Sequence, residues 1–223
     1  MLITAISDTH GHHRYLTDIL DSDDSDVIIH AGDASNQKDP ALNSSEMIDF
    51  LEWYNGLDYS YHIYIPGNHD TALHAGLINR RDYPNVIFLE NDSCEIDCVN
   101  IYGSPHTPSF GTGWAWNMKR TRIQTVWDNI PNNTDVLVTH GPPKGIMDLT
   151  WNKKHELEQG GCKCLLNTVK KVEPRFHIFG HFHDEPKIKN FGIRHFGTDT
   201  TFLNASIVDL KHNVVNFPLQ FEI

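Results

Sequence analysis

Hydrophobic residues in this chain are gathered into short runs that are separated by polar stretches. Five of these runs, at 3–6, 27–29, 61–65, 136–138 and 176–179, are rich in β-branched and aromatic residues and have the length of strands. Continuous apolar runs of this kind are typical of strands that are covered on both faces. The pattern therefore predicts an α/β chain whose strands are buried in its interior.

Between these runs, apolar residues recur at the spacing of helix faces. Residues 15–20 carry one such set after the turn that follows the first run, and residues 47–54 carry another after a polar segment, 34–44, that we interpret as a loop. Further helices are predicted at 73–78, 119–129 and 161–172.

Shorter apolar runs indicate a second, more antiparallel sheet. Residues 86–89, 94–96 and 99–102 alternate in polarity, as half-buried strands do. We therefore expect two sheets packed face to face with helices outside, and we interpret residues 1–223 as a single domain. Strands of the tail are expected to complete the second sheet, at 187–189, 193–196, 202–209 and 214–217.

Polar and ionisable residues follow the five buried runs at the place where each strand ends. The clearest case is Pro66-Gly67-Asn68-His69-Asp70. An Asn amide oxygen is a neutral metal ligand and a neighbouring His can donate a proton, so this segment indicates a metal with a proton donor beside it. Ligands and catalytic groups of open α/β sheets gather at the carboxyl ends of the strands. The other strand ends carry Asp8-Thr9-His10, Gly32-Asp33, His140-Gly141 and Gly180-His181-Phe182-His183.

These motifs, in this order, resemble the signature of the calcineurin-like metallophosphoesterases: Asp-x-His, Gly-Asp, Gly-Asn-His-(Asp/Glu), His and Gly-His-x-His. The closer likeness is to the brain-type metallophosphoesterase-domain proteins and their microbial relatives, and it covers nearly the whole chain. It rests on further segments such as Gly103-Ser104-Pro105, Thr139-His140-Gly141-Pro142-Pro143 and Phe202-Leu203-Asn204-Ala205-Ser206. The resemblance implies an αββα sandwich with a dinuclear metal site at the strand ends.

The resemblance also implies roles for individual residues. Two divalent transition-metal ions (Mn, Fe, Zn, Ni or Co) are expected, with Asp33 as the bridge between them. His69 is expected to donate a proton to the leaving alkoxide, Asp70 to orient the His69 ring, and a metal-bridging hydroxide to attack phosphorus. The remaining ligands would be Asp8, His10 and His183 for one ion, and Asn68, His140 and His181 for the other.

The expected activity is hydrolysis of a phosphodiester, and the closer resemblance implies cyclic nucleotides, 2′,3′-cyclic before 3′,5′-cyclic. A phosphomonoesterase or protein phosphatase, and an inactive metallophosphoesterase-fold binding scaffold, are the alternatives. Residues 103–117 are irregular and rich in Gly, Pro and aromatic residues, which favours a functional loop. Within it, His106, Trp114 and Trp116 are candidates for substrate contacts.

Composition narrows the range of partners to a small phosphoester or cyclic-nucleotide substrate. The 223 residues have a formal net charge of -11 and show no basic stripe, so duplex nucleic acid is not expected. No apolar run approaches the roughly 20 residues of a membrane helix, so no membrane partner is expected. The N-terminal segment has no basic region, and a cytoplasmic location is the expectation. The four cysteines lack a Cys-x-x-Cys spacing and are expected to be structural or incidental.

Overall fold

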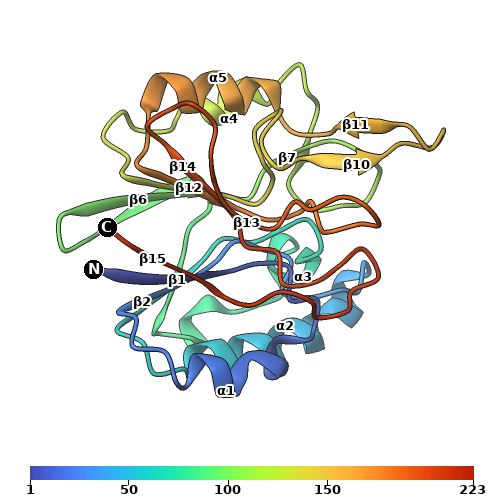
Figure 1. The fold of residues 1–223 in the computed structure, drawn as a ribbon. Coiled ribbons are helices and arrows are strands. Elements are labelled where there is room, and N and C mark those ends of the chain that lie inside the picture. The colour runs from blue at the N-terminus through green and yellow to red at the C-terminus, as the bar shows by residue number, and fades with distance from the viewer.

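The computed structural model describes residues 1–223, and most of its strands form two large mixed sheets (Figure 1). The first sheet has the strand order β15-β1-β2-β3-β4. Strands β1 to β4 are parallel to one another, and β15 runs antiparallel to β1. The bounds are β1 (Leu2–Ile6), β2 (Val27–His30), β3 (Tyr61–Tyr64), β4 (Val86–Phe88) and β15 (Leu219–Glu222).

The second sheet has the order β13-β14-β12-β9-β6-β5. Its four central strands are parallel, and the outer strands β5 and β13 are antiparallel to their neighbours. The bounds are β5 (Asp92–Ile96), β6 (Val99–Ser104), β9 (Val136–Thr139), β12 (Phe176–Phe179), β13 (Gly192–His195) and β14 (Thr201–Asn204).

An apolar core lies between the two sheets. Ile3, Ile29 and Ile63 from the first sheet belong to the same fully buried cluster as Val138 and Ile178 from the second. Each such side chain contributes roughly 1.5–3 kcal/mol when it is removed from water. Helices cover the outer faces, with α1 (Thr17–Leu20) and α2 (Pro40–Asn55) on the first sheet and α4 (Gln124–Trp127) and α5 (Lys163–Val172) on the second (Figure 1). The short helix α3 (Thr71–His74) packs against α2. The predicted αββα sandwich is confirmed.

Only two helices are longer than a single turn or so: α2 (Pro40–Asn55) and α5 (Lys163–Val172). The side chain of Asp39 accepts hydrogen bonds from the amides of Ala41 and Leu42 and so caps the start of α2. None of the helices has the length and apolar character that crossing a membrane requires. The short helices are α1 (Thr17–Leu20), α3 (Thr71–His74) and α4 (Gln124–Trp127), with 3₁₀ turns at His13–Leu16 and Arg80–Asp82.

Several predicted elements have different bounds in the structure. The helix α2 begins inside the segment 34–44 that was predicted as a loop, because Asp39 and Pro40 supply an N-cap and a first helical residue. The strand β4 pairs in parallel with β3 in the first sheet, so its assignment to the antiparallel region was wrong. The helix predicted at 73–78 is the earlier and shorter α3 (Thr71–His74), and the helix predicted at 119–129 is limited to α4 (Gln124–Trp127).

The tail also differs from the prediction. Residues 187–189 and 214–217 form no strand, and the final strand β15 joins the first sheet, where Phe221 packs into the core between the sheets. An edge strand of this kind covers the unpaired side of β1. Two small strand pairs were not predicted: β7 (Thr107–Pro108) with β8 (Asn117–Met118), and β10 (Leu149–Trp151) with β11 (Leu157–Gln159).

Candidate metal centre

The predicted site residues lie on the loops that follow β1, β2, β3, β9 and β12, so five strand ends contribute to one edge of the sandwich. Four of these residues have positive backbone φ angles: Asp8 (53°), His10 (43°), Asp33 (57°) and His181 (67°). Non-glycine residues adopt this left-handed conformation at an energetic cost, and such strain is concentrated at functional sites. The backbone conformation therefore supports a functional role for these loops.

Two glycines of the motifs allow the loops to pack tightly against the aspartates. A Cβ atom on Gly67 would collide with the side chain of Asp33, and one on Gly180 would collide with the carboxylate of Asp8. These glycines directly precede Asn68 and His181. The absence of a side chain at 67 and 180 is thus a steric requirement of the site.

Asp33 lies between two groups of side chains. Its Oδ2 atom is 3.2 Å from Nε2 of His140 and 3.9 Å from Nε2 of His10, and its Oδ1 atom accepts a hydrogen bond of 2.7 Å from the amide of His69. Potential ligand atoms of His10, Asp33 and His69 form one group, and those of Asp33, His140 and His181 form another, each within 4.8 Å of one another. Asp33 is therefore common to both groups.

The tautomers of three histidines are fixed by backbone carbonyls. Nδ1 of His10 donates to Ser35 (3.1 Å), Nδ1 of His140 to Ala31 (2.9 Å), and Nδ1 of His183 to Asp209 (3.2 Å). A carbonyl only accepts, so each Nδ1 carries the proton and each neutral ring has its lone pair on Nε2. The lone pairs of the three rings are therefore available for a metal.

The donor set fits a bound cation. Nε2 of His10 is buried and has no hydrogen-bond partner. Nε2 of His140 lies 3.1 Å from Oδ1 of Asn68, and Nε2 of His183 lies 3.2 Å from Oδ1 of Asp8. When these rings are neutral, their lone pairs face oxygen acceptors, and a divalent ion between a lone pair and an oxygen would satisfy both. The mixture of imidazole, carboxylate and amide donors suits transition metals better than calcium.

The pKa shifts of the buried groups also indicate that the carboxylates of the site need positive charge beside them. Burial lowers the pKa of His140, but the charge and the hydrogen bond of Asp33 outweigh burial and raise it to about 9. Burial raises the pKa of Asp8, yet the hydrogen bond and charge of His183 bring it below its ordinary value. The pKa of His183 is raised as well, because the hydrogen bond and charge of Asp8 outweigh burial. In the metal-free chain, protons on His140 and His183 therefore balance the buried carboxylates. Burial lowers the pKa of His10 and His181, in contrast, and keeps those rings neutral.

The carboxylate of Asp70 does not orient the ring of His69, contrary to the prediction. Nδ1 of His69 donates instead to the carbonyl of Asn36, at 3.0 Å. Asp70 is fully buried and accepts hydrogen bonds from five donors, because it faces the backbone of the neighbouring loops and not the ring. The donors are the amides of Asp33 (3.0 Å), Ser35 (3.1 Å) and Gly67 (2.6 Å) and the hydroxyls of Ser35 (2.9 Å) and Tyr64 (2.6 Å).

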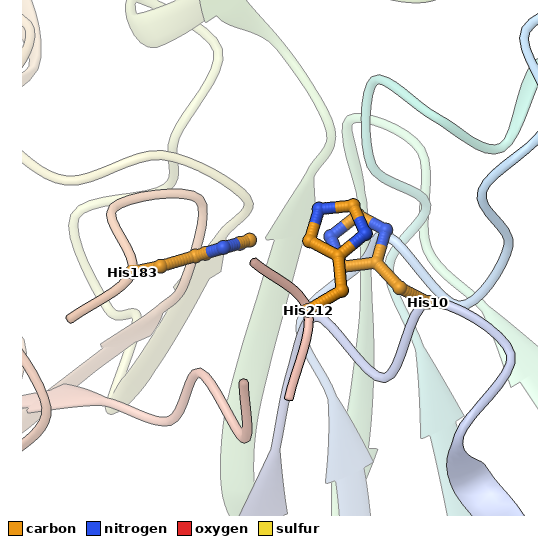
Figure 2. Close-up of side chains that lie close together, drawn as sticks. All are labelled: His10, His183 and His212. Atoms are coloured by element: carbon orange, nitrogen blue, oxygen red, sulfur yellow. The ribbon is translucent and has the colours of Figure 1, made fainter. Parts of the chain in front are cut away.

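His212 is a further residue of the site that the sequence interpretation did not single out. Its ring stacks on that of His10, with centroids 4.0 Å apart and planes 4° from parallel, and it lies 5.7 Å from the ring of His183 (Figure 2). Imidazole lone pairs lie in the ring plane, so two parallel stacked rings do not converge on one ion. His212 therefore covers the face of His10 in this arrangement.

The three predicted substrate contacts have different surroundings. Trp114 packs on His69 with ring centroids 4.4 Å apart, and Nζ of Lys38 lies 4.4 Å from its ring centroid. Trp116 is buried against His74 and belongs to the core under the first sheet, so its ring is not available for stacking and that prediction was wrong. His106 lies near His74 instead of the metal residues, and burial lowers its pKa to about 4.

Comparisons with known proteins agree with this geometry. The model of the calcineurin-like phosphoesterase family matches residues 1–185. Metallophosphoesterase domain-containing protein 1 of Homo sapiens is 36% identical over 98% of this chain and 69% of that protein. A UPF0046 protein of Caenorhabditis elegans is 30% identical over 99% of this chain and 74% of that protein.

A solved structure supports the fold independently. The phosphopantetheinyl hydrolase of Mycobacterium tuberculosis superposes with a TM-score of 0.61 at 16% identity, covering 94% of this chain and 90% of that one. The family match extends over most of the chain, and its motifs meet at one edge of the sandwich. The chain belongs to the calcineurin-like phosphoesterase family and is a phosphoesterase of this metal-dependent family.

Proposed function

We propose that the protein is a phosphodiesterase that uses two divalent metal ions and acts on cyclic nucleotides, 2′,3′-cyclic before 3′,5′-cyclic. The observation that carries the proposal is the position of Asp33 within reach of both His10 and His140. A carboxylate with two oxygens between two groups of nitrogen donors suits a bridge between two ions. The preference for cyclic nucleotides rests on the resemblance to brain-type metallophosphoesterase-domain proteins.

The chain offers enough donors for both ions. Asp8, His10 and His183 would hold one ion together with Asp33. Mn, Fe, Zn, Ni or Co bound there would lower the pKa of water and neutralise charge on the phosphate. The second ion would share Asp33 and would be held by Asn68, His140 and His181.

His69 is the proposed proton donor. Its ring is partly exposed, packs edge-on against His10 with centroids 4.7 Å apart, and is held by the carbonyl of Asn36. Because Nδ1 donates to that carbonyl, the proton for the leaving alkoxide would come from Nε2–H of the protonated ring, which leaves a neutral ring with its hydrogen on Nδ1. Trp114 packs on the His69 ring and restricts its rotation.

The proposal is tested with metal-stripped protein reloaded with Mn. Substrates are bis-p-nitrophenyl phosphate, p-nitrophenyl phosphate, and the 2′,3′- and 3′,5′-cyclic forms of AMP. We expect diesters to be cleaved in preference to the monoester, and His69→Gln to lower kcat by about 10²- to 10⁴-fold, the usual contribution of a general acid. Asp33→Asn should lower the metal content below the two equivalents per chain expected for the wild type, as measured by elemental analysis.

The control variant is His155→Asn, an exposed histidine in the turn between β10 and β11 whose positive φ of 58° Asn tolerates. It should retain wild-type rates and metal content. Preferential hydrolysis of p-nitrophenyl phosphate would favour the phosphomonoesterase alternative. Absence of all turnover with two metals bound would favour a binding scaffold.

A further inference from the structure

Two hollows lie beside the candidate metal centre, one next to His212 and one next to His181. The first, of about 390 Å³, is bordered by His212 and Tyr15, and none of its lining residues is Lys, Arg, Asp or Glu. The second, of about 270 Å³, is bordered by His181 and contains both a cation, Arg120, and a carboxylate, Glu158. Specific recognition of a small molecule needs a few directed polar groups in a concave site, and the second hollow provides them.

Arg120 is held in place but keeps most of its hydrogen-bonding capacity. Its Nη1 donates to the carbonyl of Gly161 (3.1 Å) and its Nη2 to that of Gly160 (2.8 Å), and no carboxylate lies within ion-pair distance. A guanidinium group has five N–H donors, so about three remain free. The side chain is therefore a pre-positioned fork that has no carboxylate partner in the chain.

Aromatic rings supply flat walls beside this fork. The ring of Phe182 packs against Gly160 so closely that a Cβ there would collide with it, and it lies 5.2 Å from the ring of His181. Phe110 lies 5.2 Å from His181 and is 53% exposed. Phe110 comes from the loop 103–117 that was predicted to face substrate. Flat, exposed aromatic surfaces of this kind stack on nucleobases.

Building on the proposed phosphodiesterase function, we propose that this hollow holds the base of the cyclic nucleotide and that the base it selects is guanine. Guanine presents two adjacent acceptors, O6 and N7, that match an arginine fork. Its N1–H and N2–H₂ groups match a carboxylate, here that of Glu158. Adenine presents an N6–H₂ donor where guanine has O6, so it opposes the donors of Arg120.

The test compares 2′,3′-cyclic GMP with 2′,3′-cyclic AMP in the Mn-loaded enzyme. We expect the wild type to prefer the guanine nucleotide, and Arg120→Met to reduce the ratio of the two kcat/KM values by about 10- to 100-fold, the effect of one bidentate base contact. Arg120→Lys should also lose most of the ratio, because an ammonium lacks the fork. Glu158→Gln, on an exposed strand, should lower the ratio without disturbing the fold.

Tyr15→Ala, in the other hollow, should leave the ratio at its wild-type value. Equal rates for the two nucleotides in the wild type, or an unchanged ratio in both Arg120→Met and Glu158→Gln, would overturn the proposal. Equilibrium binding of 3′-GMP and 3′-AMP separates this proposal from the proposed function. Guanine-selective binding in a protein without turnover would support the guanine subsite and contradict the phosphodiesterase proposal. Diester hydrolysis without guanine selectivity would support the phosphodiesterase proposal and contradict the guanine subsite.

Discussion

At the scale of single residues, the buried carboxylate of Asp70 connects the loops of the site. It binds the backbone of the loop that carries Asp33 and that of the loop that carries Asn68 and His69, through Gly67. Burial and the nearby charge of Asp33 raise its pKa above the ordinary value, while its hydrogen bonds oppose that shift. Asp70 is therefore a positioning residue for both loops.

We predict that Asp70→Asn lowers the free energy of unfolding by about 3 kcal/mol or more, because an amide nitrogen replaces an acceptor among five donors. Urea denaturation of the metal-stripped protein measures this loss, and Asp58→Asn, an exposed aspartate, is the matched control. If Asp70→Asn is as stable as the wild type but shifts the pH profile of kcat, Asp70 acts in the chemistry instead.

Residue types at the strand ends could be predicted because the motifs place them directly after apolar runs. The roles of residues that depend on the orientation of a side chain could not be predicted in this way. The neighbouring positions 69 and 70 suggest a paired His and Asp, but the backbone sends the Asp70 carboxylate towards Gly67 and Tyr64. His212 was missed because a turn after Asp209, with positive φ at His212, delivers it to the site and no strand end marks it.

At the scale of elements, α2 fastens the loops of the site through Asn43. This fully buried residue lies in the first turn of the helix, and its Nδ2 is within hydrogen-bond distance of Ser35 Oγ (2.8 Å) and the carbonyls of Gln37 (2.7 Å) and His69 (3.0 Å). Its Oδ1 accepts from the amide of Ala72 at 3.0 Å. The start of α2 therefore supports the loops that bear Asp33 and His69.

We predict that Asn43→Asp destabilises the protein by about 2–4 kcal/mol, because a carboxylate of the same shape cannot donate and would be buried without a counter-ion. His69 should become more mobile as well, so kcat should fall. Thermal melting and diester hydrolysis measure the two effects. Asn129→Asp, an exposed change at a helix end, should have little effect on either quantity. Wild-type stability in Asn43→Asp would contradict this role for α2.

This early start of α2 is also where element prediction failed. The segment 34–44 is polar because Ser35 and Asn43 form hydrogen bonds with the site loops and Asp39 caps the helix. From the sequence, this polarity alone indicated a loop. Long-range pairing was the second obstacle: β15 completes the first sheet by pairing with β1, at the other end of the chain, and local patterns carry no information on such partners. Strands β1, β2, β3, β9 and β12, in contrast, were clear from their apolar runs, whereas β6 was assigned to the antiparallel region although it pairs in parallel with β9.

At the scale of the whole molecule, several histidines lie in the interior away from the metal residues. Burial lowers the pKa of His177 to about 3. The hydroxyl of Thr139 donates to the carbonyl of Gly141, so it accepts from Nε2–H of His177 at 2.8 Å. Nδ1 of His177 is buried and has no partner. The interior therefore accepts this ring only in its neutral form.

This burial makes folding stability depend on pH, and we predict the sign. The unfolded chain binds a proton at His177 near its ordinary value of 6.5, whereas the folded chain does so only near 3. Between these values the unfolded state holds more protons, so stability is fully present above pH 6.5 and declines as the pH falls towards 3. At pH 5.5 the loss from this residue alone is about 1.4 kcal/mol, one pKa unit below 6.5.

His177→Gln isolates this contribution, because a glutamine amide can still donate to Thr139 but does not titrate. Urea denaturation of metal-stripped wild type and variant at pH 7.5 and 5.5 should show a smaller pH-dependent loss in the variant, by about 1.4 kcal/mol. Removing the metals beforehand prevents acid release of bound ions from contributing to the difference. Equal losses in the two proteins would mean that His177 is protonated in the folded interior, which its unpartnered Nδ1 argues against.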